Sequence, residues 1–164
     1  KSELEKKEDA YILYQLGKSY YMAGDYSEAE KYFERATAYD LDPRLEYVLD
    51  MIVSYGYSMV NSGKTKEALA FSNLYDEFSY SADYVFMMGI VCMNNALFED
   101  AVGLFEKVKE YDSCNLCGVN SYLADYNIGV IFECLGHREE ALMYYGKCKG
   151  YDKAEERIEA LTEN

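Results

Sequence analysis

Four stretches of the chain repeat one packing pattern, and this repetition constrains the fold more than any other feature. Each stretch has a glycine in an apolar context, and the four glycines are separated by 39, 33 and 40 residues: Gly17, Gly56, Gly89 and Gly129. A small residue follows each glycine at a constant spacing, at Ala29, Ala68, Ala101 and Ala141. Small residues at such positions let two helices approach closely, so each copy predicts one helical hairpin.

The pattern predicts eight helices in four hairpins, followed by a ninth helix that covers the last apolar face. The expected helices are 9–22, 26–38, 44–61, 65–78, 82–95, 98–110, 119–135, 138–149 and 153–162. We expect one domain over 1–164, with repeats at about 10–43, 44–81, 82–115 and 119–152 and a capping helix at 153–163.

Two junctions are longer than the others. The first contains Asp40-Leu41-Asp42-Pro43, where Pro43 is expected to start the next helix, and the other is Asp112–Gly118. The second copy fits the pattern least well, because Ser72 stands where a Phe is expected and Tyr75 where a small residue is expected.

The stretch from Leu13 to Ala36, L-Y-Q-L-G-K-S-Y-Y-M-A-G-D-Y-S-E-A-E-K-Y-F-E-R-A, resembles the tetratricopeptide repeat. The resemblance implies an all-α, right-handed α-α superhelix that binds a protein or peptide in a concave groove lined by the first helix of each hairpin. Carried over to this sequence, the groove residues are Tyr11, Tyr14, Lys18, Tyr21, Val53, Tyr57, Val60, Asn61, Phe86, Ile90, Met93, Asn94, Tyr126, Val130 and Glu133.

Chaperone-binding members of that family clamp a terminal carboxylate with Lys, Arg and Asn from successive repeats. The corresponding residues here are Tyr14, Lys18, Ser54, Asp83 and Met87. One cation does not make a clamp, and Asp83 would repel a carboxylate. The resemblance therefore disfavours a co-chaperone role.

Four stretches also resemble the C-terminal helical-repeat segment of some Firmicutes family-2 glycosyltransferases. They are Y-Q-L-G-K-S-Y-Y-M-A-G-D-Y, L-E-Y-V-L-D-M-I-V-S-Y-G-Y-S, N-L-Y-D-E-F-S-Y-S-A-D-Y-V-F and G-V-N-S-Y-L-A-D-Y-N-I-G-V-I-F-E-C-L-G. This resemblance implies a bacterial parent enzyme whose catalytic domain lies before Lys1. The segment would then bind an acceptor, its own catalytic domain or a second subunit.

Charge and hydropathy exclude several kinds of partner. The chain has 16 Lys+Arg against 30 Asp+Glu, a formal net charge of −14, which repels nucleic acid and anionic membranes. No apolar run approaches the roughly 20 residues of a membrane span, and no leader sequence is visible.

The spacing of Cys114, Cys117, Cys134 and His137 matches a four-ligand zinc site as a string. A predicted helix separates the two pairs by about 24 Å, however, which is far too long for one ion. We therefore expect no metal, with Cys134 packed against a neighbouring helix and His137 in a turn; a Cys114–Cys117 disulfide is the remaining alternative.

Other catalytic motifs are weak. Asp40 and Asp42 have the Asp-x-Asp form of a metal and diphosphate site, but helix ending and capping explain them better. There is no Gly-Lys-Ser/Thr for a phosphate loop, and we expect no catalytic residues and no cofactor. Free cysteines, with Cys92, Cys134 and Cys148 acting as small apolar residues, predict a reducing, cytoplasmic location.

The sequence thus predicts a non-catalytic binding module, with a glycosyltransferase as its parent. A free-standing adaptor is the main alternative, and a metal or redox protein is the third.

Overall fold

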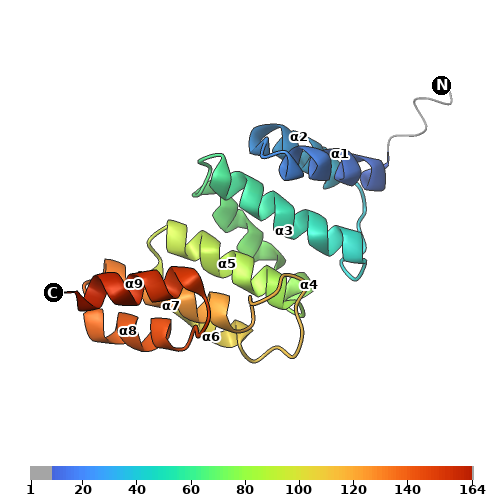
Figure 1. The fold of residues 1–164 in the computed structure, drawn as a ribbon. Coiled ribbons are helices and arrows are strands. Elements are labelled where there is room, and N and C mark those ends of the chain that lie inside the picture. Colours follow the sequence, from blue (N-terminus) through green and yellow to red (C-terminus); the bar gives the residue numbers. More distant parts are fainter. Residues whose placement is uncertain (1–8, 164) are drawn as a thin grey trace, which may run out of the picture. The chain divides into compact units, whose positions relative to one another are not determined.

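The computed structural model describes residues 9–163 (Figure 1). Regular structure in this range is entirely helical, which confirms the predicted all-α class of four hairpins and a C-terminal helix. The elements are α1 (Ala10–Met22), α2 (Tyr26–Ala36), α3 (Glu46–Asn61), the 3₁₀ helix η1 (Glu67–Leu74), α4 (Tyr75–Phe78), α5 (Ala82–Asn94), α6 (Phe98–Val108), α7 (Tyr122–Cys134), α8 (Arg138–Gly146) and α9 (Asp152–Thr162).

The chain divides into two compact units between Phe78 and Ser79. The first unit holds the α1–α2 hairpin and the α3–η1–α4 hairpin, and the second holds α5–α6, α7–α8 and α9. The predicted domain and repeat boundaries remain predictions, and residues 1–8 and 164 lie outside the described range.

Three of the four hairpins predicted by the glycine pattern, the first, third and fourth, pack a glycine against an aromatic ring. A Cβ atom placed on Gly17 would lie 2.6 Å from Cε1 of Phe33. A Cβ atom placed on Gly89 would lie 2.6 Å from Cε1 of Phe105, and one placed on Gly129 would lie 2.6 Å from Cε1 of Tyr145. Real Cβ atoms do not approach carbon so closely, so the close approach requires glycine at all three positions.

The ends of the helices follow ordinary capping chemistry. Asp9 accepts a hydrogen bond from the Ile12 amide at 2.8 Å, and Asp25 accepts one from the Glu28 amide at 3.2 Å. Ser81 caps α5 in the same way. These side chains satisfy amides that have no partner within the first helical turn.

The predicted regular helix over 65–78 is wrong, because Glu67–Leu74 forms a 3₁₀ helix and only Tyr75–Phe78 is α-helical. A 3₁₀ helix has three residues per turn, so Ala68 and Phe71 share one face. Phe71 is buried and packs edge-on against Tyr55, with ring centroids 5.0 Å apart. Phe71 therefore takes the role expected of a Phe at position 72, which explains the exposed Ser72.

The starts of two further helices differ from the prediction, and α2, α6 and α8 end two or three residues earlier than predicted. Pro43 does not start a helix: α3 begins at Glu46, and the Asp42 carboxylate accepts hydrogen bonds from the Arg44 amide and guanidinium at 2.9–3.0 Å. The helix expected from 119 begins at Tyr122, after Gly118 with a φ of 92°. The long junctions thus end in turns of their own before the next helix begins.

Among residues 9–163, no helix combines the length and the apolar character that crossing a bilayer requires.

Candidate functional site

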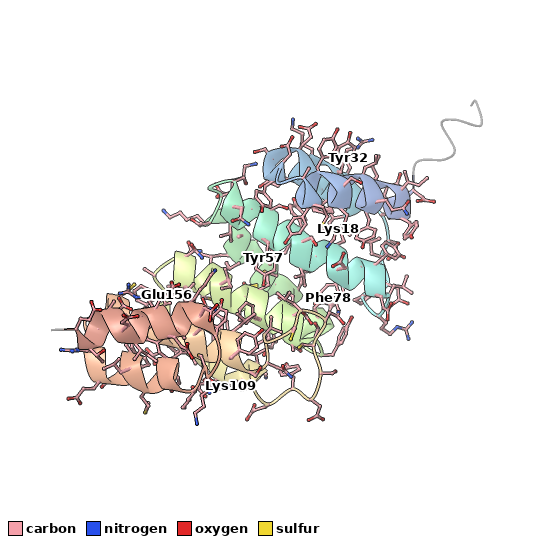
Figure 2. All side chains as sticks on the ribbon, in the orientation of Figure 1. Lys18, Tyr32, Tyr57, Phe78, Lys109 and Glu156 are labelled. Carbon is pink, nitrogen blue, oxygen red and sulfur yellow. The ribbon has the colours of Figure 1, made fainter. Side chains whose placement is uncertain are left out.

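In the first unit, the predicted groove residues of α1 lie beside a polar network with α3. The Lys18 ammonium lies 2.9 Å from Oδ2 of Asp50 and donates to Oγ of Ser54 at 2.9 Å. Lys18 is labelled in Figure 2. The Tyr14 hydroxyl donates to Oδ2 of the same carboxylate at 2.7 Å. These bonds fix the direction of three side chains that are only partly buried.

Aromatic rings surround this network. Tyr11 meets Tyr47 edge-on at 5.1 Å, and Tyr14 lies 5.5 Å from Tyr47. The Lys18 ammonium lies 4.9 Å from the ring centroid of Tyr21, within the range of a cation–π contact. Helical periodicity puts Tyr57 on the stripe of α3 that carries Asp50 and Ser54. We call this surface the tyrosine face and define it as Tyr11, Tyr14, Lys18, Tyr21, Tyr47, Asp50, Ser54 and Tyr57.

Burial, together with the hydrogen bond to Asp50, raises the pKa of Tyr14 well above its usual value. Burial also raises the pKa of Tyr21, and the neighbouring Tyr26 and Asp50 raise this pKa further. A phenol is neutral near neutral pH even at its ordinary pKa, and both of these remain so. The Tyr14 hydroxyl gives its one proton to Asp50, whereas that of Tyr21 can donate at the surface. The face combines apolar ring area with oriented polar tips.

Tyr47 and Asp50 were missed by the sequence reasoning, which carried over only fixed groove positions. The signal was present, because Asp50 is an acid within the apolar run of α3 and Tyr47 precedes it by one helical turn. The predicted residues Val53 and Val60 also lie on α3 and are half-buried.

In the second unit, the predicted groove residues of α7 are covered by another part of the chain, because α9 packs on them. Tyr126 meets Tyr151 edge-on at 5.2 Å, and Tyr126 and Val130 belong to the apolar cluster that includes Ala154 of α9. The Glu133 carboxylate accepts from Nε of Arg157 at 3.0 Å and from the Tyr145 hydroxyl at 2.8 Å. Residues of α9 therefore already occupy this part of α7.

The α5 positions are mixed. Phe86 is 5% exposed and packs edge-on against Phe105, so its ring fills the hairpin. Ile90 and Met93 are half-buried, while Asn94 is exposed and donates to the Ile90 carbonyl at 2.8 Å. The second unit thus offers fewer accessible predicted residues than the first.

Asp83, predicted to repel a carboxylate ligand, has a structural role instead. It is buried and accepts hydrogen bonds from the amides of Asn115 and Leu116 at 2.7 and 2.8 Å. Its charge therefore holds the inserted junction, and the neighbouring Met87 is fully buried.

All five cysteines are free, and they differ in burial: Cys114 is partly buried and Cys117 is exposed. Cys92 and Cys148 are buried as predicted, and burial raises the pKa of the Cys148 thiol to about 11. The prediction for Cys134 was wrong, since this side chain is exposed at the end of α7. His137 lies in the turn before α8, as expected, and stacks on Phe132. Within residues 9–163, no group of three or more potential metal ligands comes together.

The sequence model for the family described as "Tetratricopeptide repeat" matches residues 10–43, which span α1, α2 and the following junction. These residues are therefore similar in sequence to a tetratricopeptide repeat. No curated protein matches the chain in sequence.

Solved structures extend the tetratricopeptide likeness to nearly the whole chain. A structure described as YrrB, a TPR protein with an unusual peptide-binding site, superposes with a TM-score of 0.72 at 23% identity, covering 90% of this chain and 73% of that one. A MamA structure gives a TM-score of 0.69 at 16% identity, covering 90% and 83%. A putative kinesin light chain from Podosopora anserina gives 0.60 at 15% identity, covering 96% and 79%. The chain therefore has the tetratricopeptide-repeat fold.

Proposed function

We propose that this chain is a non-catalytic protein-interaction module that binds a peptide or protein segment on its tyrosine face. The observation that carries the proposal is the network of Lys18, Tyr14 and Asp50, which orients polar tips among tyrosine rings. Tyrosine suits such a surface because it offers a rigid apolar body and a hydroxyl that can bind a peptide group. Tetratricopeptide proteins bind peptides or proteins as a class, which supports the same assignment.

The chemistry of the face favours an extended segment with apolar side chains over a carboxylate terminus. Lys18 is already neutralised by Asp50 at 2.9 Å, so it offers little free positive charge to an anion. The phenol hydroxyl of Tyr21 can pair with a peptide group, while the rings of Tyr21 and Tyr57 pack against side chains. We therefore do not expect this face to clamp a terminal carboxylate.

The test is a selection of peptides on the wild-type chain from a displayed random library, followed by affinity measurement on variants. We expect Tyr21→Ala/Tyr57→Ala to weaken the selected peptides by about thirtyfold or more, since truncating an aromatic anchor typically costs about 2 kcal/mol. Tyr80→Ala removes an exposed tyrosine outside the face and should leave affinity unchanged. Equal affinity in all three proteins would refute the assignment of the face.

A narrower proposal is that the module belongs to a bacterial family-2 glycosyltransferase and works in the cytoplasm. One observation favours it: the resembling stretch L-E-Y-V-L-D-M-I-V-S-Y-G-Y-S, residues 45–58, carries Tyr47, Asp50, Ser54 and Tyr57 of the tyrosine face. The five free cysteines are compatible with a reducing compartment.

In this narrower proposal the ligand is the acceptor, the catalytic domain or a second subunit. A free-standing adaptor fits the same fold equally well. Reading the complete gene separates the two, because a nucleotide-sugar-binding α/β domain encoded directly upstream supports the enzyme, and a start codon just before Lys1 supports the adaptor.

A further inference from the structure

A second candidate binding site lies in the first unit, away from the tyrosine face. It is an open cavity of about 280 Å³ between the end of α2, the long junction, α3 and the η1–α4 segment. Its lining is Thr37, Tyr39, Leu41, Pro43, Val48, Ile52, Leu74, Glu77 and Phe78. Val48, Ile52 and Phe78 are buried and form an apolar floor, while Thr37, Tyr39 and Glu77 are exposed at the mouth. Phe78 marks its position in Figure 2.

The cavity arises where the chain departs from the repeat pattern. The long first junction contributes Leu41 and Pro43, and the irregular second helix contributes Leu74 and Phe78. In the 3₁₀ segment Phe71 turns toward Tyr55, away from the cavity lining. Both departures therefore leave the same space open.

This cavity is distinct from the tyrosine face. At 3.6 residues per turn, Val48 and Ile52 lie roughly 160° around α3 from Asp50, Ser54 and Tyr57 of the tyrosine face. A ligand bound at one site thus does not block the other. A result that refutes binding at the tyrosine face therefore does not refute binding at this cavity.

The size and lining of the cavity suit one large apolar side chain. An apolar cavity of about 150 Å³ is enough to hold a benzene ring. A space of about 280 Å³ with a buried aliphatic and aromatic floor accepts a Phe or Leu side chain entering from solvent. The opening between Tyr39 and Glu77 gives that access.

The charge around the mouth of the cavity determines which kind of peptide segment can bring such a side chain to it. Glu77 lines the opening, and the exposed Asp40 and Asp76 adjoin the lining residues Tyr39 and Glu77 in sequence. Arg44, which adjoins the lining residue Pro43, is paired with Asp42 at 3.0 Å. The whole chain adds a net charge of −14. An acidic rim around an apolar floor favours a cationic partner, because opposite charges steer association and like charges oppose it.

We propose that this cavity binds a basic peptide segment of a partner protein by inserting one large apolar side chain, with Lys or Arg residues beside it facing Glu77, Asp40 and Asp76. The site is separate from the one proposed for the tyrosine face and gives the module a second, charge-selective contact.

The probe is a short, end-blocked peptide with a central phenylalanine flanked by lysines, compared with peptides in which alanine replaces the phenylalanine or glutamates replace the lysines. Methyl NMR reports the site through Val48, Ile52 and Leu74. We expect the phenylalanine–lysine peptide to shift these methyl signals to saturation and each comparison peptide to bind at least about tenfold more weakly. Raising the salt concentration should weaken the lysine peptide.

Two substitutions test the site from the protein side. Leu41→Trp fills the cavity and should abolish binding, and Glu77→Lys reverses the charge at the mouth and should weaken it by about threefold to tenfold. Glu67→Lys makes the same charge change on an exposed residue of η1 outside the lining and serves as the matched control. If Leu41→Trp does not fold, the Glu77 and Glu67 pair still decides.

Three outcomes overturn the proposal. Equal binding of the phenylalanine and alanine peptides excludes insertion of a side chain. Equal effects of Glu77→Lys and Glu67→Lys exclude the acidic rim. If the unliganded chain dimerises and Leu41→Trp abolishes the dimer, the occupant of the cavity is a second copy of the chain and not a basic peptide.

Discussion

Gly17 lies directly against the ring of Phe33, so close that a Cβ on this glycine would sit 2.6 Å from Cε1 of the ring. Phe33 is fully buried and cannot swing away into solvent. This relationship holds α1 and α2 together, and equivalent contacts at Gly89 and Gly129 serve the third and fourth hairpins. The spacing of these glycines in the sequence is therefore a direct consequence of helix packing.

Gly17→Ala should destabilise the chain by about 1–3 kcal/mol, because the added methyl group overpacks a filled core. Gly103→Ala is the matched control: Gly103 is exposed within α6 and has no atom within 4 Å of an added Cβ. That substitution should stabilise by about 0.4–1 kcal/mol, because alanine favours helix. Urea midpoints measure both, and a stable Gly17→Ala protein would mean that the packing is misassigned.

Phe71→Ala should cost about 3–5 kcal/mol, as expected for removing a buried phenylalanine. Ser72→Ala should change the free energy of unfolding by no more than about 0.5 kcal/mol, because Ser72 is exposed. In a regular α-helix of the predicted register the order would be reversed. Denaturant unfolding of the two variants thus tests the 3₁₀ assignment of η1.

Ala96→Gly should stabilise the chain by about 1 kcal/mol. Ala96 has a φ of 57° at the turn of the third hairpin, where the other hairpins place Gly24, Gly63 and Gly136 with φ of 77–86°. Alanine pays a steric cost in this left-handed region that glycine avoids. The same substitution at Ala160, exposed within α9, should destabilise by about 1 kcal/mol, and thermal melts compare the two.

The free energy of unfolding of Glu133→Gln should be about 1 kcal/mol lower than that of the wild type near neutral pH, because the substitution weakens the bonds that join α7 to α9. The Arg157 guanidinium holds the pKa of Glu133 below its usual value. A depressed pKa stabilises the folded state above the unfolded pKa of about 4.3 and loses this effect as the pH falls through the folded value.

The difference between wild type and Glu133→Gln should therefore shrink as the pH is lowered from 6 to about 3. Urea denaturation at several pH values checks it, with Glu140→Gln on the exposed surface of α8 as the control. A difference that stays constant over this range would show that the ion pair contributes nothing.

The hairpins could be predicted from the sequence because glycine and other small residues have one packing role in them, which is to let two helices approach closely. Glycines opposite rings and small residues between helices repeat at a fixed spacing, so the hairpins could be placed without a structure. The 3₁₀ helix could not, because its register depends on Phe71 meeting Tyr55 from another helix. The start of α3 was also missed, since a local bond between Asp42 and Arg44 competes with helix formation after Pro43.

The candidate site was harder to predict, because accessibility depends on what the rest of the chain covers. Groove positions on α1 and α7 look alike in sequence, yet Arg157 and Tyr151 of the C-terminal segment contact Glu133 and Tyr126. Asp50 was overlooked because its role depends on Lys18, more than thirty residues earlier in the chain. Sequence spacing alone gives helix faces but not their long-range partners.

A crystal structure of the chain with a peptide selected on it tests the central claim most directly, namely that this tetratricopeptide-type module binds through its tyrosine face. We expect the peptide backbone to hydrogen-bond with hydroxyls of the face, such as that of Tyr21, and its side chains to pack on Tyr57. A peptide bound elsewhere, with the rings of Tyr21 and Tyr57 left open to solvent, would contradict the account.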